Sequence, residues 1–398
     1  MSLSSIYVAM ALLATSAWGQ LYLVTGSQSS KSPEGSASVL FRVGDAGEIE
    51  RVEEIVSQDA GTWFIEISSE SRKLVAFSPS DGGNIEARFT VVDLDKPGVV
   101  KACPMPRNTP GYVAFAEWLA DVRGKGLTML QQSAVNGFAN RGLVRGMSLD
   151  ASVPCDESFE TIAPADIEGI VVNGQAGVAG LAANEYVDFA MDRDGKIMRR
   201  FAGGDVVYLG YQVPEVLRSG LDLPYISVMV NNSDVLVVGI IGKGAVGATK
   251  LIALRKSDRT WHLVPSLQGD RPVPRSVGHY LAIPERHLKS AAFPESAGGV
   301  EWRKARGEMG PSIAEQFRDS DLVYPGKLHL YDLDSEKVYT IDTKQGDSEV
   351  LLVEDGKVYY RASDRLYSAP ITNSGIGTAR LLATDDAIRD THWAFIKH

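Results

Sequence analysis

The sequence predicts an all-β protein of the β-propeller class, because one hairpin pattern recurs along its 398 residues. Residues 327–343 show the pattern best: aromatic and β-branched residues alternate with polar ones on both sides of an Asp/Ser turn at 334–337. Such period-2 runs around a turn are typical of two antiparallel strands. Residues 87–103 and 250–264 repeat the pattern. Repeated hairpins favour a propeller, in which each repeat forms one blade.

Taken in order, the outer hairpins are predicted near residues 38–56, 87–103, 143–162, 186–210, 250–264, 327–343 and 365–383. A more apolar pair of strands precedes each of them except the first. We expect the C-terminal segment 392–397 to supply the missing inner strand, which closes the ring and removes free sheet edges. Seven units of about fifty residues fit a seven-bladed ring. Six or eight blades stay open, because residues 166–222 show no clear pattern.

The N-terminus predicts a signal peptide over residues 1–19. Residues 6–14 are apolar, and Ala17 and Gly19 are small residues where a signal peptidase cleaves. We expect cleavage after Gly19 and a secreted or periplasmic protein. The alternative is a buried first strand, since residues 1–5 carry no Lys or Arg. No other run reaches the roughly 18 apolar residues of a membrane helix, so no membrane span is expected.

One propeller domain is predicted over residues 20–398, with an insertion at about 284–326. Pro and Gly residues break the rhythm of strands within this insertion. Residues 311–319 begin with a proline and predict a two-turn helix. We expect the insertion to project from the body of the ring.

Charge and cysteine content limit which partners and which disulfide bonds the protein can have. The formal charge is −10 with scattered acidic residues, which argues against nucleic acid or an anionic membrane as a partner. The two cysteines, Cys103 and Cys155, are too few for a disulfide framework. An exported protein can bridge such a pair, and two separately buried thiols are the alternative. We expect a monomer.

Residues 234–283 combine an apolar strand, a tryptophan on a later strand and a Pro-x-Pro-Arg phrase. The characteristic positions are Trp261, Pro272, Pro274, Arg275, Gly278 and His279. Their kind and order resemble a kelch repeat, although Gly239-Ile240 stands where that family has a glycine pair. The other units resemble generic blades of bacterial secreted propellers. The resemblance implies a six- or seven-bladed ring and, most often, a binding role.

A glycine motif follows the apolar run 235–241. Gly242, Gly244 and Gly247 have the spacing of a dinucleotide-binding fingerprint. The acid required about twenty residues later is missing, because Asp270 comes too late and Pro265 interrupts the second strand. A hairpin loop explains the motif better, so no cofactor is predicted.

No motif in the sequence predicts a catalytic residue or a metal site. The six histidines have no metal-ligand spacing. Neither a serine-hydrolase elbow nor an activated cysteine is apparent. Separated residues can still converge at a propeller axis, so an enzyme stays open.

The candidate ligand site is the segment 270–279. It contains Asp270, Arg271, Arg275 and His279, and it enters an inner strand beside the expected axial mouth. Arginine forks suit carboxylate or phosphate groups, so an anionic small molecule or carbohydrate is the expected ligand. The alternative is that Arg275 and His279 only tie neighbouring blades together.

Two function classes fit these observations. The first is an exported binding or protein-interaction scaffold. The second is a propeller enzyme, a hydrolase or lyase that acts on a sugar or lactone. A cluster of His, Arg and carboxylates at the axial mouth would favour the enzyme, whereas an exposed aromatic patch would favour binding. Fold analogy favours the binding role.

Overall fold

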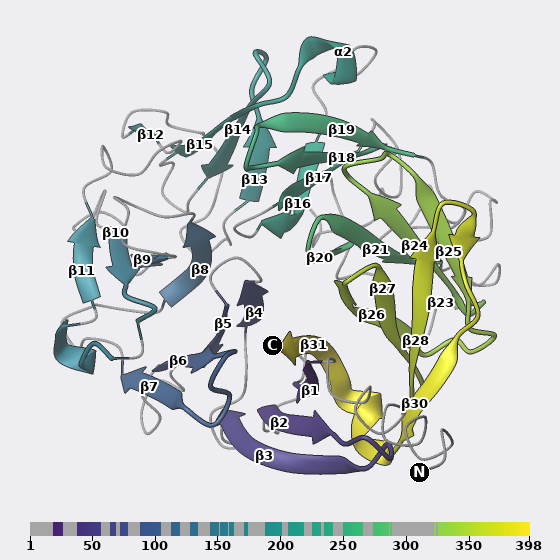
Figure 1. The fold of residues 1–398 in the computed structure, drawn as a ribbon. Coiled ribbons are helices and arrows are strands. Elements are labelled where there is room, and N and C mark those ends of the chain that lie inside the picture. Colours follow the sequence, from purple (N-terminus) through teal and green to yellow (C-terminus); the bar gives the residue numbers. More distant parts are fainter. Residues whose placement is uncertain are drawn as a thin grey trace, which may run out of the picture.

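The fold is a ring of antiparallel β-sheets around a common centre in the computed structural model (Figure 1). The predicted all-β propeller class is therefore confirmed. No helix of the described residues is long and apolar enough to cross a membrane. The structure describes residues 19–26, 38–56, 64–68, 72–78, 88–104, 113–119, 128–133, 144–150, 152–157, 159–162, 171–173, 188–200, 206–218, 225–231, 235–241, 250–265, 274–285, 287–288, 322–323 and 325–398.

Each sheet has its innermost strand near the centre of the ring and its outermost strand at the rim (Figure 1). The first three sheets, from the inside outward, are β31 (Thr391–Lys397), β1 (Gln20–Thr25), β2 (Ser38–Val43) and β3 (Ile49–Val56); β4 (Phe64–Ser68), β5 (Lys73–Ser78), β6 (Arg88–Asp93) and β7 (Val100–Pro104); and β8 (Val113–Leu119), β9 (Thr128–Ser133), β10 (Val144–Met147) and β11 (Phe159–Ile162).

Four further sheets complete the described part of the ring. They are β13 (Asp188–Met191), β14 (Lys196–Arg200), β15 (Val206–Gln212) and β12 (Val171–Asn173); β16 (Tyr225–Asn231), β17 (Val235–Ile241), β18 (Lys250–Arg255) and β19 (Thr260–Val264); β20 (Arg275–Val277), β21 (Tyr280–Pro284), β24 (Lys327–Asp332) and β25 (Val338–Asp342); and β26 (Ser348–Glu354), β27 (Lys357–Ala362) and β28 (Arg365–Thr372), with β29 (Gly375–Ile376) and β30 (Arg380–Thr384) both paired to β28.

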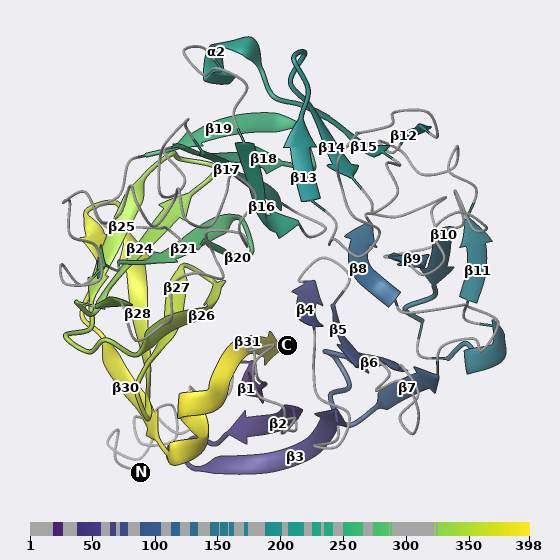
Figure 2. The same ribbon diagram turned by 180° about the vertical axis from the view of Figure 1, so that it is seen from behind.

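The two ends of the chain share one sheet. β31 pairs with β1 over the whole strand, from Gln20 opposite Lys397 to Thr25 opposite Thr391. The ring of Tyr22 stacks on that of Phe395 with centroids 5.1 Å apart. In Figure 2, which shows the ring from behind, β31 again lies beside β1 near the centre. The N-terminal strand is therefore held from both sides, by β31 and by β2.

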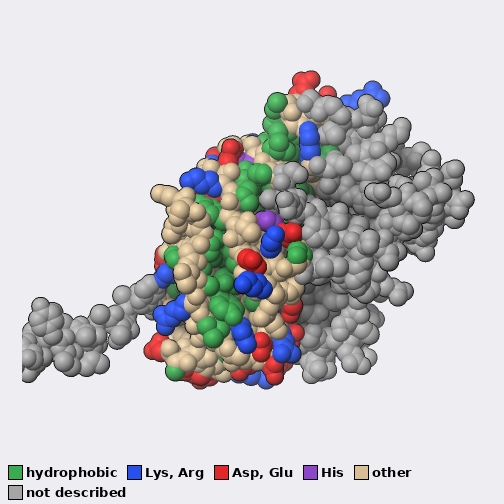
Figure 3. Space-filling model, turned by 90° about the vertical axis from the view of Figure 1, so that its right-hand side faces the viewer, with side chains coloured by type: hydrophobic (Ala, Val, Ile, Leu, Met, Phe, Trp, Pro, Cys, Tyr) green, Lys and Arg blue, Asp and Glu red, His purple; other side chains and the backbone are tan. Residues whose placement is uncertain are grey.

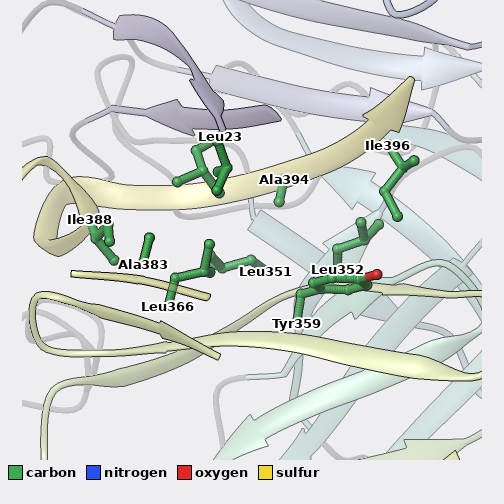
Figure 4. Close-up of a cluster of buried hydrophobic side chains, with 10 residues drawn as sticks. Leu23, Leu351, Leu352, Tyr359, Leu366, Ala383, Ile388, Ala394 and Ile396 are labelled. Carbon is green, nitrogen blue, oxygen red and sulfur yellow. The ribbon is translucent and has the colours of Figure 1, made fainter. Parts of the chain in front are cut away.

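The hydrophobic core lies between neighbouring sheets. On β1, Leu23 packs toward the sheet of β26, whereas Tyr22 and Val24 pack toward the sheet of β4. Figure 4 shows Leu23 and Ala394 above the Leu351 side chain that faces them. Because side chains alternate between the two faces of a strand, a strand buried on both faces must be apolar at successive positions. This packing explains the continuous apolar run over residues 21–24 of β1.

Residues 166–222 do not form the predicted outer hairpin at 186–210, and this prediction is wrong. β13 and β14 are instead the two inner strands of their sheet. The outermost strand is β12, which comes earlier in the sequence and pairs with β15. The predicted hairpin placed strands within 186–210 correctly, but the sequence carries no information about which strand lies at the rim.

A long segment of the chain separates the second and third strands of one sheet. β21 pairs with β24, although residues 285–326 separate them in sequence. Near the two ends of this segment, β22 (His287–Leu288) pairs with β23 (Leu322–Val323). The helix predicted at 311–319 lies outside the described residues.

The glycine motif connects two paired strands. β17 and β18 are antiparallel neighbours, with Ile240 opposite Lys250. Residues 250–255 are therefore a strand, not the helix that a dinucleotide fingerprint requires. Gly242, Gly244 and Gly247 themselves lie outside the described residues.

A disulfide joins two neighbouring sheets at the rim. Cys103 lies on β7, and Cys155 begins the short 3-10 helix η1 (Cys155–Glu157) ahead of β11. Their Cα atoms are 5.3 Å apart. Nearby, Lys101 donates a hydrogen bond to the carbonyl of Asp150 at 3.0 Å.

The described surface seen in Figure 3 carries acidic and basic side chains close together, in keeping with the scattered charges of the sequence.

Candidate functional site

Three neighbouring sheets bring polar side chains together where their innermost strands begin. Arg275 is the first residue of β20, Glu349 is the second of β26, and His392 is the second of β31. We call the side of the ring at which these strands begin the entry face. The entry-face cluster is the set Arg275, Asp347, Glu349, Arg361 and His392.

The carboxylate of Glu349 joins the members of the cluster. Nη1 of Arg275 donates to its Oε1 atom. Nδ1 of His392 lies 2.7 Å from its Oε2 atom, and Nη2 of Arg361 donates to the same oxygen at 3.2 Å. Both oxygens are thus occupied, so the carboxylate is held in one orientation.

Arg361 has a positioning role. Its side chain is 6% exposed. Nε donates to the carbonyl of Thr391 at 2.8 Å, and Nη1 donates to Oδ1 of Asp347 at 2.6 Å. With Nη2 on Glu349, all three nitrogens bind protein groups. Arg361 therefore fixes the start of β31 against the start of β26.

Arg275 and His392 differ from Arg361 because they keep unused polar atoms and reach solvent. Each side chain is 20% exposed. Among the described residues, Nε and Nη2 of Arg275 and Nε2 of His392 have no hydrogen-bond partner. The guanidinium of Arg275 lies over the ring of Trp393, 5.2 Å from its centroid. The imidazole of His392 meets the same indole edge-on.

Glu349 is ionised throughout the physiological pH range. Burial alone would raise the pKa of this carboxyl, but the charge of Arg275 and the hydrogen bond from His392 outweigh burial and lower the pKa to about 2. An ionised carboxylate only accepts hydrogen bonds, so the Nδ1 atom of a neutral His392 carries the proton. Nε2 then presents a lone pair.

The shifted pKa of Glu349 predicts a pH-dependent stability. The folded pKa of about 2 lies below the ordinary value of about 4.3, so the contribution is complete above the ordinary value and is lost as the pH falls toward 2. We expect Glu349→Gln to lower the unfolding free energy at pH 7 by about 3 kcal/mol. Urea unfolding from pH 7 to pH 2 measures this.

The matched control is Glu354→Gln, because Glu354 meets the exposed His398 at 2.8 Å and no arginine. This variant should retain the fall in stability between pH 4 and pH 2 (about the range between the two pKa values). If Glu349→Gln showed the same acid-induced loss as the unmodified protein, the ion pairs of Glu349 would contribute nothing to the fold.

The structure separates the residues of the predicted ligand site. Arg275 lies in the entry-face cluster, but His279 lies in the turn between β20 and β21, at the other end of the strand. At about 3.3 Å per residue, the four steps from Arg275 to His279 span roughly 13 Å of chain. Asp270 and Arg271 lie outside the described residues.

His279 belongs to a second group of polar residues. Its Nε2 atom is 3.9 Å from Asp332 and 3.8 Å from Asp334, and such a set could approach one cation. However, Asp332 accepts hydrogen bonds from the backbone of Asp334 at 2.9 Å and from Oγ of Ser335 at 2.7 Å, while Arg255 pairs with Asp334. Asp332 therefore stabilises its own turn, and Asp334 pairs with an arginine of the neighbouring sheet.

A polar hollow of about 500 Å³ lies next to the short helix α2 (Glu215–Arg218). Arg218, one of the three cations that line it, donates from Nε to the carbonyl of Val213 at 2.9 Å and from Nη1 to that of Arg193 at 2.7 Å. Because Arg218 is engaged with backbone groups, the hollow is a weaker candidate than the entry-face cluster.

Sequence reasoning found Arg275 but missed Glu349, Arg361 and His392. The available signal was a polar residue at the start of an otherwise apolar inner strand. On β26, Ser348 and Glu349 precede buried Val350, Leu351 and Leu352. A single acid in that position is also common at a solvent-exposed strand end, so it could not be singled out.

Comparisons with known proteins identify no family. No protein-family model and no curated protein sequence matches the chain. Apo AztD from Citrobacter koseri is 9% identical, with a TM-score of 0.47, over 95% of this chain and 97% of that one. A Bacteroides uniformis protein provisionally described as a 6-phosphogluconolactonase is 10% identical, with a TM-score of 0.42, over 95% and 99%. Function therefore has to be argued from the site itself.

Proposed function

We propose that this chain is an exported, seven-bladed propeller that binds a sugar acid at the entry-face cluster. Six four-stranded sheets and one five-stranded sheet support the blade number, and the pairing of β1 with β31 supports closure by the C-terminal strand. The apolar run at 6–14 and the Cys103–Cys155 disulfide support export. The kelch-like character of residues 234–283 stays a prediction.

The observation that carries the proposal is the unused donor edge of Arg275. Glu349 accepts a hydrogen bond from Nη1 of this guanidinium, and the N–H groups of Nε and Nη2 remain for a ligand. A guanidinium edge binds a carboxylate through two parallel hydrogen bonds. Stacking on Trp393 holds this edge in place before a ligand arrives. The ligand should therefore carry a carboxylate.

Other members of the cluster favour a ligand that also carries hydroxyl groups. Asp347 is 60% exposed and uses only Oδ1 for Arg361, so Oδ2 can accept a hydrogen bond. Nε2 of His392 can accept another. Acceptors beside a carboxylate-binding edge fit a sugar acid better than an apolar acid. A protein partner stays a hypothesis, because no feature of the described residues selects one.

Binding of galacturonate by isothermal titration calorimetry tests the proposal. The unmodified protein should bind galacturonate but not galactose, which lacks the carboxylate. Arg275→Lys keeps a positive charge beside Glu349 but cannot donate two parallel hydrogen bonds to a carboxylate. It should therefore weaken the binding of galacturonate roughly tenfold or more. The matched control is Arg42→Lys, because Arg42 pairs with Glu50 on an exposed hairpin away from the cluster.

The control variant should bind galacturonate as the unmodified protein does, and both variants should keep its Tm. The proposal fails if galacturonate does not bind. It also fails if Arg275→Lys folds and binds galacturonate with unchanged Kd, since the fork would then make no contact with the ligand.

A further inference from the structure

His392 is held in the way that enzymes hold a general base. Its Nδ1 atom meets the carboxylate of Glu349 at 2.7 Å, and that carboxylate is itself fixed by Arg275 and Arg361. A base that is oriented through one nitrogen presents the other nitrogen to the reacting group. Nε2 is that nitrogen here, and it has no partner among the described residues. The side chain is 20% exposed, so a ligand can reach it.

A positive group stands beside this base. Arg275 and His392 bind the two oxygens of the same carboxylate, and both contact the indole of Trp393. A carbon next to a carboxylate releases its proton only when the negative charge that develops on the carboxylate is stabilised. The free edge of Arg275 supplies that stabilisation. Because both side chains bind the carboxylate of Glu349 and contact the indole of Trp393, a ligand held by Arg275 lies beside His392.

Covalent catalysis is a poor fit to the described part of the chain. Both cysteines form the disulfide. No described serine or threonine hydroxyl is hydrogen-bonded to His392, so there is no nucleophile that this imidazole would activate. Proton transfer to and from the ligand is the chemistry that a lone oriented base and a neighbouring guanidinium can perform.

We infer that His392 removes the proton from the carbon next to the carboxylate of a bound uronic acid glycoside, and this inference rests on the function proposed above. The electron pair of the broken C–H bond forms a C=C double bond, and the C–O bond to the substituent at the β position breaks. The departing oxygen takes up the proton that His392 received. The products are an unsaturated uronate and a sugar with a free hydroxyl group. The elimination is redox-neutral and has no second substrate.

Incubation of the mature full-length protein with polygalacturonate tests the inference. The new double bond is conjugated with the carboxylate, so ultraviolet absorbance follows the reaction. His392→Asn retains an amide N–H where Nδ1 donates to Glu349 but removes the base. We expect the rate to fall by about 10²-fold or more, while galacturonate still binds with a Kd raised by less than about tenfold, because only the one acceptor at Nε2 is lost.

A second measurement detects proton abstraction directly. In D₂O, the unmodified protein should exchange the proton next to the carboxylate of galacturonate, as followed by NMR, and His392→Asn should not. The matched control is His398→Asn, because His398 makes a similar 2.8 Å contact with Glu354 outside the cluster. This variant should keep both the elimination and the exchange.

The outcomes distinguish the two proposals. Binding of galacturonate without elimination or exchange overturns the role of His392 and leaves the binding function in place. Absence of binding overturns both. Elimination that persists in His392→Asn also overturns the role of His392, because the base would then be another group.

Discussion

Deletion of residues 392–398 should leave a chain that no longer unfolds in one cooperative transition. The deletion removes nearly all of β31, including the buried side chains of Ala394, Phe395 and Ile396. Loss of a buried phenylalanine side chain alone costs about 3–5 kcal/mol. β1 would also become a free sheet edge. Because domains of this kind are stable by about 5–15 kcal/mol, the combined loss approaches the total stability.

Thermal unfolding followed by circular dichroism measures this effect. Deletion of His398 alone is the matched control, because this residue is exposed and lies beyond the end of β31. The control should keep its Tm, and Phe395→Ala should lie between the two truncations. A protein ending at residue 391 with the Tm of the complete chain would show that the ring does not depend on β31.

The hairpins could be predicted because the pattern of buried and exposed positions along each strand appears in the sequence as a pattern of apolar and polar residues. On β25, exposed and buried residues alternate from Val338 to Asp342, so the sequence alternates too. Inner strands such as β17 are buried at successive positions and are continuously apolar. The two kinds of strand are therefore distinguishable. The placement of β12 was not predictable, because its rim position depends on its pairing with β15 and not on its own three residues.

The candidate site was less accessible to sequence reasoning than the fold. Arg275 and Glu349 are 74 residues apart, and Glu349 and His392 are 43 apart. Only the packing of three neighbouring sheets brings them together, since β20, β26 and β31 belong to different sheets. His279 is close to Arg275 in sequence but lies at the opposite end of a strand. Proximity in the sequence was thus a poor guide to proximity in this site.

Reduction of the disulfide should destabilise the protein by about 4 kcal/mol, on the loop-entropy relation for a separation of 52 residues. The bond between Cys103 and Cys155 limits the conformations of the unfolded chain, so its loss favours unfolding even where the folded ring is unchanged. It joins the rim of the sheet of β4 to the rim of the sheet of β8. Urea unfolding with and without a thiol reductant measures the difference.

Chemical reduction is a cleaner test than substitution, because Cys103 is 1% exposed and a serine there would bury a hydroxyl group. The double variant Cys103→Ser/Cys155→Ser serves as the control for the reductant itself, which should not alter its unfolding curve. Equal curves for the oxidised and reduced protein would contradict the prediction. Since the effect arises in the unfolded chain, the entry-face cluster should bind galacturonate equally well in the oxidised and reduced folded protein.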